Sequence, residues 1–65
     1  MTPDEPAPPL TIDRRRAIFR AVVEAQDAGA TVEASRVAVG QRYLVTVNQV
    51  RAVEREGLTK EWPPL

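Results

Sequence analysis

The small size of the chain is the feature that most restricts its fold. Its 65 residues form one small domain, and such a domain buries only about 60% of the surface that its unfolded chain exposes. Other small domains compensate with disulfides or zinc, but the sequence has no cysteine and no histidine. We therefore expect an all-α fold in which a few helices share one apolar core, with stability that can depend on a partner.

Proline separates a tail from the folded part of the chain. Four of the six prolines lie within residues 1–10. Proline lacks a backbone N–H and disfavours helix at the residue before it, so this segment cannot start a helix. The sequence predicts a disordered or extended tail over residues 1–10 and a helical domain over residues 11–65.

The residues after the tail follow the period of a helix. Thr11 suits an N-cap, Gly29 suits the position just past a helix end, and the run between them contains no proline or glycine. At 100° per residue, one side of this segment collects a set of mainly apolar residues, namely Ile18, Phe19, Val22, Ala25 and Gln26. This pattern predicts a helix over residues 12–28 that buries one stripe.

Two further helices are predicted before Gly57. The second begins at either Thr31 or Ser35, since both can cap a helix, and Ser35 is the preferred start. Thr46 is then the N-cap of a third helix, which reaches about Glu56 and ends at Gly57. The prediction is a three- to four-helix bundle.

Residues 35–58 have the layout of a helix-turn-helix, in which a short helix, a turn of three or four residues and a longer helix follow one another. In this arrangement the second helix can lie in a DNA major groove. The apolar positions that would lock the two helices together are Val39, Tyr43, Val45, Val50 and Val53. We interpret these five residues as core.

The same stretch carries a family resemblance. It reads VGQRYLVT over residues 39–46 and VRAVE over residues 50–54, and this register resembles the region-four DNA-binding domain of bacterial sigma factors, whose helix-turn-helix commonly reads I-G-x-R-F-G-V-T-x-x-x-V-R-x-I-E. The resemblance covers about a third of the chain. It implies that Thr46 caps the recognition helix near a phosphate and that Arg51 reaches the groove. The family usually has Gly where this chain has Leu44, and a left-handed leucine costs roughly 1 kcal/mol or more, so the turn could differ.

The outward side of the predicted third helix carries the candidate DNA-binding residues. Arg51 and Arg55 can make forked contacts to guanine or phosphate, and Asn48 can pair with adenine. The full candidate set is Thr46, Val47, Asn48, Arg51, Ala52 and Arg55, with Arg42, Arg36 and Lys60 as flanking phosphate contacts. A merely solvated helix face is the alternative interpretation. The triplet at residues 14–16 is more typical of a solubilising surface than of a second phosphate clamp.

Catalysis and membrane association are not expected. The carboxylates and hydroxyls are scattered without a base to activate them, and the three glycines are too far apart for a phosphate loop, so we expect no enzyme, metal or cofactor. No apolar run approaches the roughly 18 to 20 residues that cross a bilayer, and the N-terminus lacks the features of a signal peptide. These observations predict a cytoplasmic protein.

Our main hypothesis from the sequence is a small non-enzymatic helix-turn-helix protein that binds duplex DNA and acts in transcription or DNA-element control. One such module binds weakly, so a homodimer or a larger complex would supply affinity. The alternative is an adaptor or accessory subunit that docks on RNA polymerase or another nucleic-acid-processing complex. It would use the third helix or the tail Trp62-Pro63-Pro64-Leu65, and the formal net charge of zero favours it.

Overall fold

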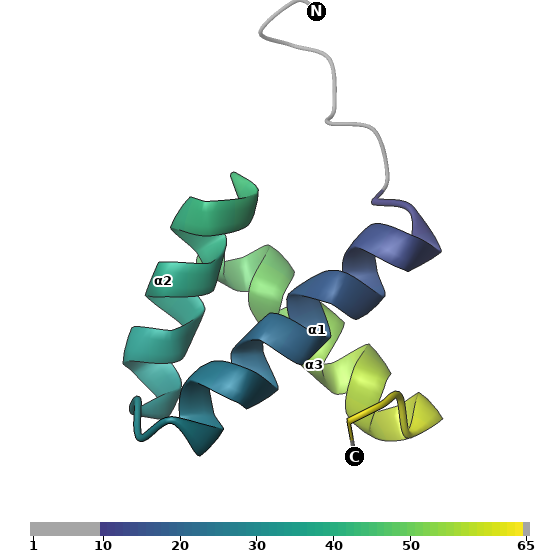
Figure 1. Cartoon of the computed structure of the whole chain (residues 1–65). Coiled ribbons are helices and arrows are strands. Elements are labelled where there is room, and N and C mark those ends of the chain that lie inside the picture. Colours follow the sequence, from purple (N-terminus) through teal and green to yellow (C-terminus); the bar gives the residue numbers. More distant parts are fainter. Residues whose placement is uncertain (1–9, 65) are drawn as a thin grey trace, which may run out of the picture.

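Three α-helices make up the fold. The computed structural model describes residues 10–64, which contain α1 (Ile12–Asp27), α2 (Val32–Tyr43) and α3 (Val47–Lys60). In Figure 1, α1 runs across the front, α2 stands beside it and α3 passes behind α1. The predicted all-α bundle is confirmed. None of these helices is long and apolar enough to cross a membrane.

The predicted tail over residues 1–10 lies outside the described residues except for its last member. Leu10 is partly buried and packs against the core. Its carbonyl oxygen also accepts a hydrogen bond from the Arg15 guanidinium. Leu10 therefore belongs to the folded part of the chain, whose start was predicted one residue later, at Thr11.

All three helices begin at a threonine whose hydroxyl accepts a hydrogen bond from a backbone N–H three residues later. Thr11, Thr31 and Thr46 make this bond at 3.2, 3.1 and 3.1 Å. The preferred start of the second helix at Ser35 was thus wrong. Ser35 lies inside α2 and is fully buried, where its hydroxyl donates to the Val32 carbonyl at 2.7 Å and accepts from the Gln26 amide at 3.1 Å.

All three helices end at a residue with left-handed backbone, namely Gly29 (φ 104°), Leu44 (φ 57°) and Glu61 (φ 54°). The residue after each of these donates its N–H back to the carbonyl five residues earlier, at 2.9 to 3.0 Å. These bonds satisfy carbonyl groups that a helix end leaves without partners. Gly29 ends α1 as predicted, whereas α3 continues past Gly57 to Lys60.

Gly57 serves packing rather than helix termination. It is buried in α3 against the Phe19 ring of α1, and a Cβ atom added there would lie only 2.3 Å from Phe19 Cδ1. A glycine inside a helix costs about 1 kcal/mol relative to alanine. The close packing of α1 against α3, which only a residue without a side chain allows here, offsets this cost.

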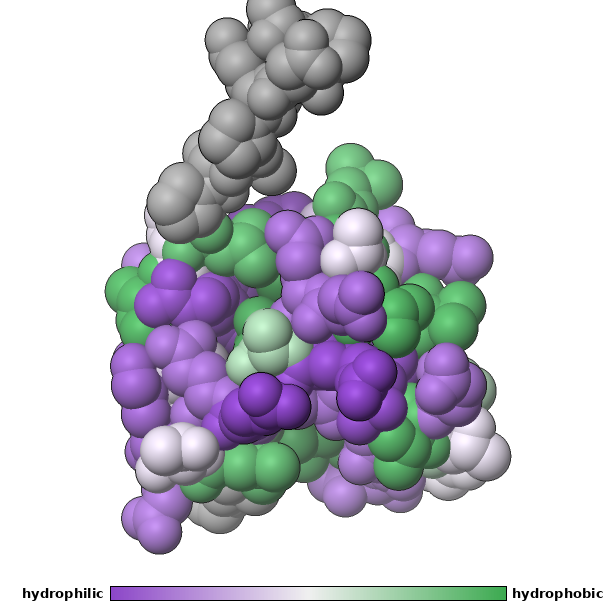
Figure 2. Space-filling view, turned by 180° about the vertical axis from the view of Figure 1, so that it is seen from behind, coloured by the Kyte–Doolittle hydropathy of each residue, from purple (hydrophilic) through white to green (hydrophobic). Residues whose placement is uncertain are grey.

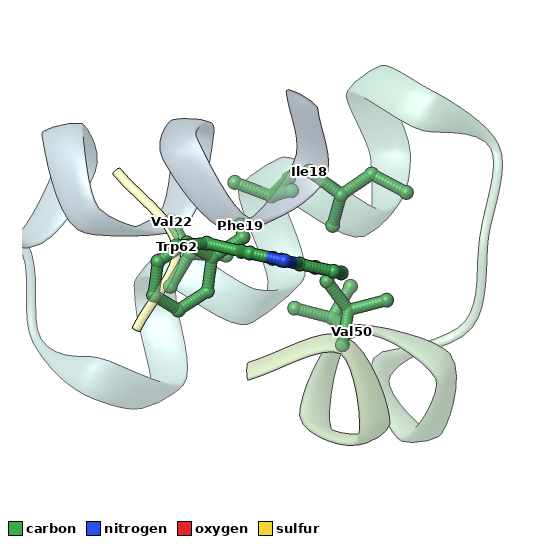
Figure 3. Close-up of a cluster of buried hydrophobic side chains, with 7 residues drawn as sticks. Ile18, Phe19, Val22, Val50 and Trp62 are labelled. Atoms are coloured by element: carbon green, nitrogen blue, oxygen red, sulfur yellow. The ribbon is translucent and has the colours of Figure 1, made fainter. Parts of the chain in front are cut away.

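The core lies where the three helices meet (Figure 3). α1 contributes Ile18, Phe19 and Val22, which confirms the predicted stripe, and the other helices add Val39, Val50 and Val53. Trp62 follows α3 and returns to this cluster, where it is only 7% exposed. Its ring meets the Phe19 ring edge to face, with centroids 6.1 Å apart and planes at 77°. Trp62 is therefore an interior anchor that closes the core.

Candidate nucleic-acid interface

The turn between α2 and α3 is short and tightly bonded. Residues 44–46 connect the two helices, and the Val45 N–H donates to the Gly40 carbonyl at 2.9 Å. A Cβ atom at Gly40 would lie 2.9 Å from the Val45 carbonyl oxygen, so a larger residue there would displace the turn. Leu44 has φ 57° and ψ 44°, which is the left-handed conformation that the glycine of the resembled family would suit. The turn therefore has this geometry without the glycine.

The first turn of α3 is held by a reciprocal pair of hydrogen bonds. The Thr46 hydroxyl accepts from the Gln49 N–H at 3.1 Å, and the Gln49 side-chain oxygen accepts from the Thr46 N–H at 2.8 Å. The predicted N-cap is thus confirmed. Gln49 was not among the predicted capping residues, although a threonine followed three residues later by glutamine is a known capping signature. This capping box fixes the direction in which α3 leaves the turn.

α3 has an inward face and an outward face, as its periodicity predicts. Val50, Val53 and Gly57 are buried in the core. The exposed residues of the candidate set on this helix are Asn48, Arg51, Ala52 and Arg55, while Val47 is half-buried. Seen from behind, on the side where α3 lies, the surface is mainly hydrophilic across its middle (Figure 2). The helix therefore presents two arginines and an asparagine to solvent on a rigid scaffold.

Ion pairing divides the basic residues into two groups. Among residues 10–64, salt bridges join Arg15 to Glu56, Arg20 to Glu24, Arg36 to Glu54 and Lys60 to Glu56. In the same part of the chain, Arg51 and Arg55 have no carboxylate within salt-bridge distance. Their guanidinium donors thus remain available to a ligand.

Two of the predicted flanking phosphate contacts are committed to neighbours within the fold. Arg36 Nε lies 2.7 Å from Glu54 Oε2, and this bond ties α2 to α3 across partly buried side chains. Lys60 Nζ lies 2.9 Å from Glu56 Oε2 and 5.7 Å from the Trp62 ring centroid. The structure thus does not bring Arg36 and Lys60 to the outward face of α3 as unpaired charges.

Arg42 has a different environment. Its Cζ atom lies 5.4 Å from the centroid of the Tyr43 ring, at the end of α2 that leads into the turn. Arg14 of α1 reaches the same ring, with its Cζ atom 5.5 Å from the centroid, and donates to the Tyr43 carbonyl at 2.7 Å. From the sequence, Arg14 was interpreted as part of a solubilising triplet. No periodicity signal could have paired it with Tyr43, because the contact arises only from the packing of α1 beside α2.

The outward face of α3 also has a shallow depression. It has a volume of about 430 Å³ and is lined by Ala52, Arg55, Glu56, Thr59 and Lys60. Three of the predicted DNA contacts thus border a concave surface, namely Ala52, Arg55 and Lys60, and Lys60 is paired there with Glu56.

The C-terminal tail does not form the accessible peptide that the adaptor alternative used. Trp62 is part of the core, Pro63 and Pro64 are exposed, and Leu65 lies outside the described residues. Because the tryptophan is the largest apolar side chain of that tail, its burial removes the main anchor that a partner protein would have used.

Comparison with known proteins adds no relative. The chain matches no protein-family model, no curated protein and no solved structure.

Proposed function

We propose that this protein binds duplex DNA without catalysis, with α3 in the major groove, and acts in transcription or DNA-element control. The observation that carries the proposal is the outward face of α3. It exposes Asn48, Arg51 and Arg55, and neither arginine has a carboxylate partner within residues 10–64. The turn and the capping box support it by holding α3 at a fixed angle to α2.

Each exposed side chain has a matching group on DNA. The arginine fork can donate two hydrogen bonds to O6 and N7 of guanine, and the asparagine amide can pair with N6 and N7 of adenine. Val47 and Ala52 are small apolar residues that suit a thymine methyl group. The first N–H groups of α3 add donors for a backbone phosphate at the edge of the groove.

The small number of phosphate contacts that one module can make sets the expected strength of binding. A single module with roughly three to five phosphate contacts binds weakly at physiological salt, and log affinity falls by about 0.9 per contact for each log unit of salt. A homodimer on two half-sites, or a larger complex that contains RNA polymerase, would supply the remaining affinity. Titrations should therefore begin at low salt.

The test is a titration of fluorescently labelled random-sequence duplex DNA with Arg51→Gln, Arg55→Gln and the wild type. On random-sequence DNA these arginines act mainly through phosphate contacts, so each α3 variant should weaken binding at low salt and reduce the slope of log affinity against log salt by about 0.9. Arg16→Gln is the matched control, because it removes the same charge from an exposed position of α1 that has no salt bridge among the described residues. If both α3 variants stay folded and bind as tightly as the wild type, the assignment of this face is wrong.

A protein-docking role is the second candidate, and the exposure of Leu44 favours it. This leucine is 89% exposed at the helix-turn-helix corner, where the fold makes no use of its side chain. If docking is the function, purified RNA polymerase, the partner named in the adaptor hypothesis, should capture the wild type and not Leu44→Ser. Indifference to DNA at low salt together with this loss of capture would favour docking over DNA binding.

A further inference from the structure

The side chain of Tyr43 is the meeting point of two arginines from different helices. Arg14 comes from the first turn of α1, and Arg42 precedes the tyrosine in α2. Their Cζ atoms lie 5.5 and 5.4 Å from the ring centroid, within the range of cation–π attraction. Two guanidinium groups from different helices are therefore both held against one ring.

The tyrosine positions both guanidinium groups without neutralising them. Arg14 donates one hydrogen bond to the Tyr43 carbonyl at 2.7 Å, and the ring provides the second contact. A guanidinium has five N–H donors, so most of the Arg14 donors remain unused. Within residues 10–64, no salt bridge reaches Arg14 or Arg42, whereas Arg15 and Arg20 nearby on α1 are both paired with glutamates.

One side of this cluster borders a hollow of about 280 Å³ between α1 and α2. The lining of the hollow includes Arg42 and Tyr43 and the ion-paired Arg20 and Glu24, and it does not include Arg14. Only residues 44–46 separate Tyr43 from the start of α3. A helix in the major groove is flanked by the phosphates of both strands, so basic groups next to its N-terminal end are well placed to reach the backbone.

We propose that Arg14 and Arg42, held against Tyr43, form a phosphate clamp that takes a backbone phosphate of duplex DNA beside the groove occupied by α3. This inference rests on the proposed function and extends it to a second contact, on α1 and the end of α2. The chemistry suits a phosphodiester, because two planar guanidinium groups with unused N–H donors match the oxygens of a phosphate. The clamp contributes affinity in the same way on every DNA sequence.

The salt dependence of binding tests this clamp. Wild type, Arg14→Gln and Arg42→Gln are titrated with random-sequence duplex over a series of salt concentrations, and log affinity is plotted against log salt. Each clamp variant should reduce the slope by about 0.9, the value for one lost phosphate contact. Arg16→Gln is the control again, since it lies two residues along α1 from Arg14 and removes one exposed charge.

The outcomes separate the clamp from the proposed function. A reduced slope for both clamp variants and an unchanged slope for Arg16→Gln supports the clamp. Equal slopes for all four proteins, or an equal reduction for all three variants, overturns it and leaves DNA binding by α3 in place. Absence of wild-type binding at low salt overturns both proposals. Arg42→Gln keeps the test valid if Arg14→Gln unfolds, because among residues 10–64 Arg42 makes no hydrogen bond through its side chain.

Discussion

At the scale of single residues, Leu44 combines an unfavourable backbone with an unused side chain. Its φ of 57° places the Cβ atom of a leucine too close to the following carbonyl, which costs about 1 to 2 kcal/mol. The side chain is 89% exposed, so it recovers none of this by burial. The corner of the helix-turn-helix is thus held in place by its surroundings, namely the Gly40 hydrogen bond behind it and the capping box ahead of it.

We therefore predict that Leu44→Gly raises the free energy of unfolding by about 1 kcal/mol, because glycine adopts the left-handed conformation without a steric penalty. Chemical denaturation followed by circular dichroism measures the change. The matched control is Leu58→Gly, which makes the same replacement at another exposed leucine, inside the right-handed α3. That variant should lose at least about 1 kcal/mol. A loss of stability in both variants would contradict our account of the turn.

The helix caps were predictable from the sequence, because a cap depends on residues that are close together in the chain. Thr11, Thr46 and Gly29 occupy the capping positions that their residue types favour. Ser35 was misassigned because its residue type allows two roles. The amide of Gln26 bonds its hydroxyl from another helix, and this contact is absent from any local pattern.

At the scale of the helices, Glu56 of α3 makes two charge contacts, one with Arg15 of α1 and one with Lys60 a turn later in α3. It accepts hydrogen bonds from Lys60 at 2.9 Å and from Arg15 at 2.8 Å. The hydrogen bond from Lys60 lowers the pKa of Glu56 most, and Arg15 lowers it further, while partial burial opposes both. The carboxylate is therefore held in its charged form more firmly than in the unfolded chain.

This shift gives a pH-dependent contribution to stability. A pKa that is lower in the folded state stabilises the fold above the unfolded value of about 4.3, and this stabilisation is lost as the pH falls through the folded pKa. We predict that Glu56→Gln melts at a lower temperature than the wild type at pH 7, and that the difference shrinks below about pH 4. Thermal melts at several pH values measure it, with Glu61→Gln as the control for net charge. A difference that stays constant down to pH 2 would contradict this role.

Helix type and order were predictable, and so were the buried sides of α1 and α3, because apolar periodicity records them directly. In α2 only Val39 was predicted among the three buried residues, since Ser35 and Gly40 are not apolar side chains.

The end of α3 was not predictable. Gly57 has the residue type of a helix terminator, but its position is decided by the Phe19 ring, which lies far away in the sequence. The outward face of α3 followed from the same periodicity, whereas the convergence of Arg14 and Arg42 on Tyr43 required the packing of α1 against α2.

At the scale of the whole molecule, one aromatic side chain beyond the last helix completes the core. Trp62 packs with Phe19 of α1 and follows directly on the end of α3. A core in a chain of this length rarely supplies more than about 3 to 5 kcal/mol in total, and truncation of a buried tryptophan costs about the same. The folded state thus depends on a residue that the adaptor alternative used for docking.

We predict that Trp62→Ala is largely unfolded at 25 °C and has lost most of the far-ultraviolet helix signal. Trp62→Phe, which keeps an aromatic ring, should retain a cooperative transition at reduced stability. In the wild type, fluorescence of this single tryptophan and circular dichroism should report the same unfolding midpoint, since the indole contacts the core that all three helices build. A Trp62→Ala protein that melts near the wild-type temperature would contradict the anchor role.

Because Gly57 contacts the Phe19 ring, substitutions at these two positions depend on each other. A methyl group at position 57 has no room unless the ring at position 19 moves or shrinks. In sequences related to this one, we therefore expect a larger residue at position 57 of α3 to occur together with a smaller residue at position 19 of α1. Covariation of these two positions, which lie 38 residues apart, would then reflect the close approach of the two helix axes.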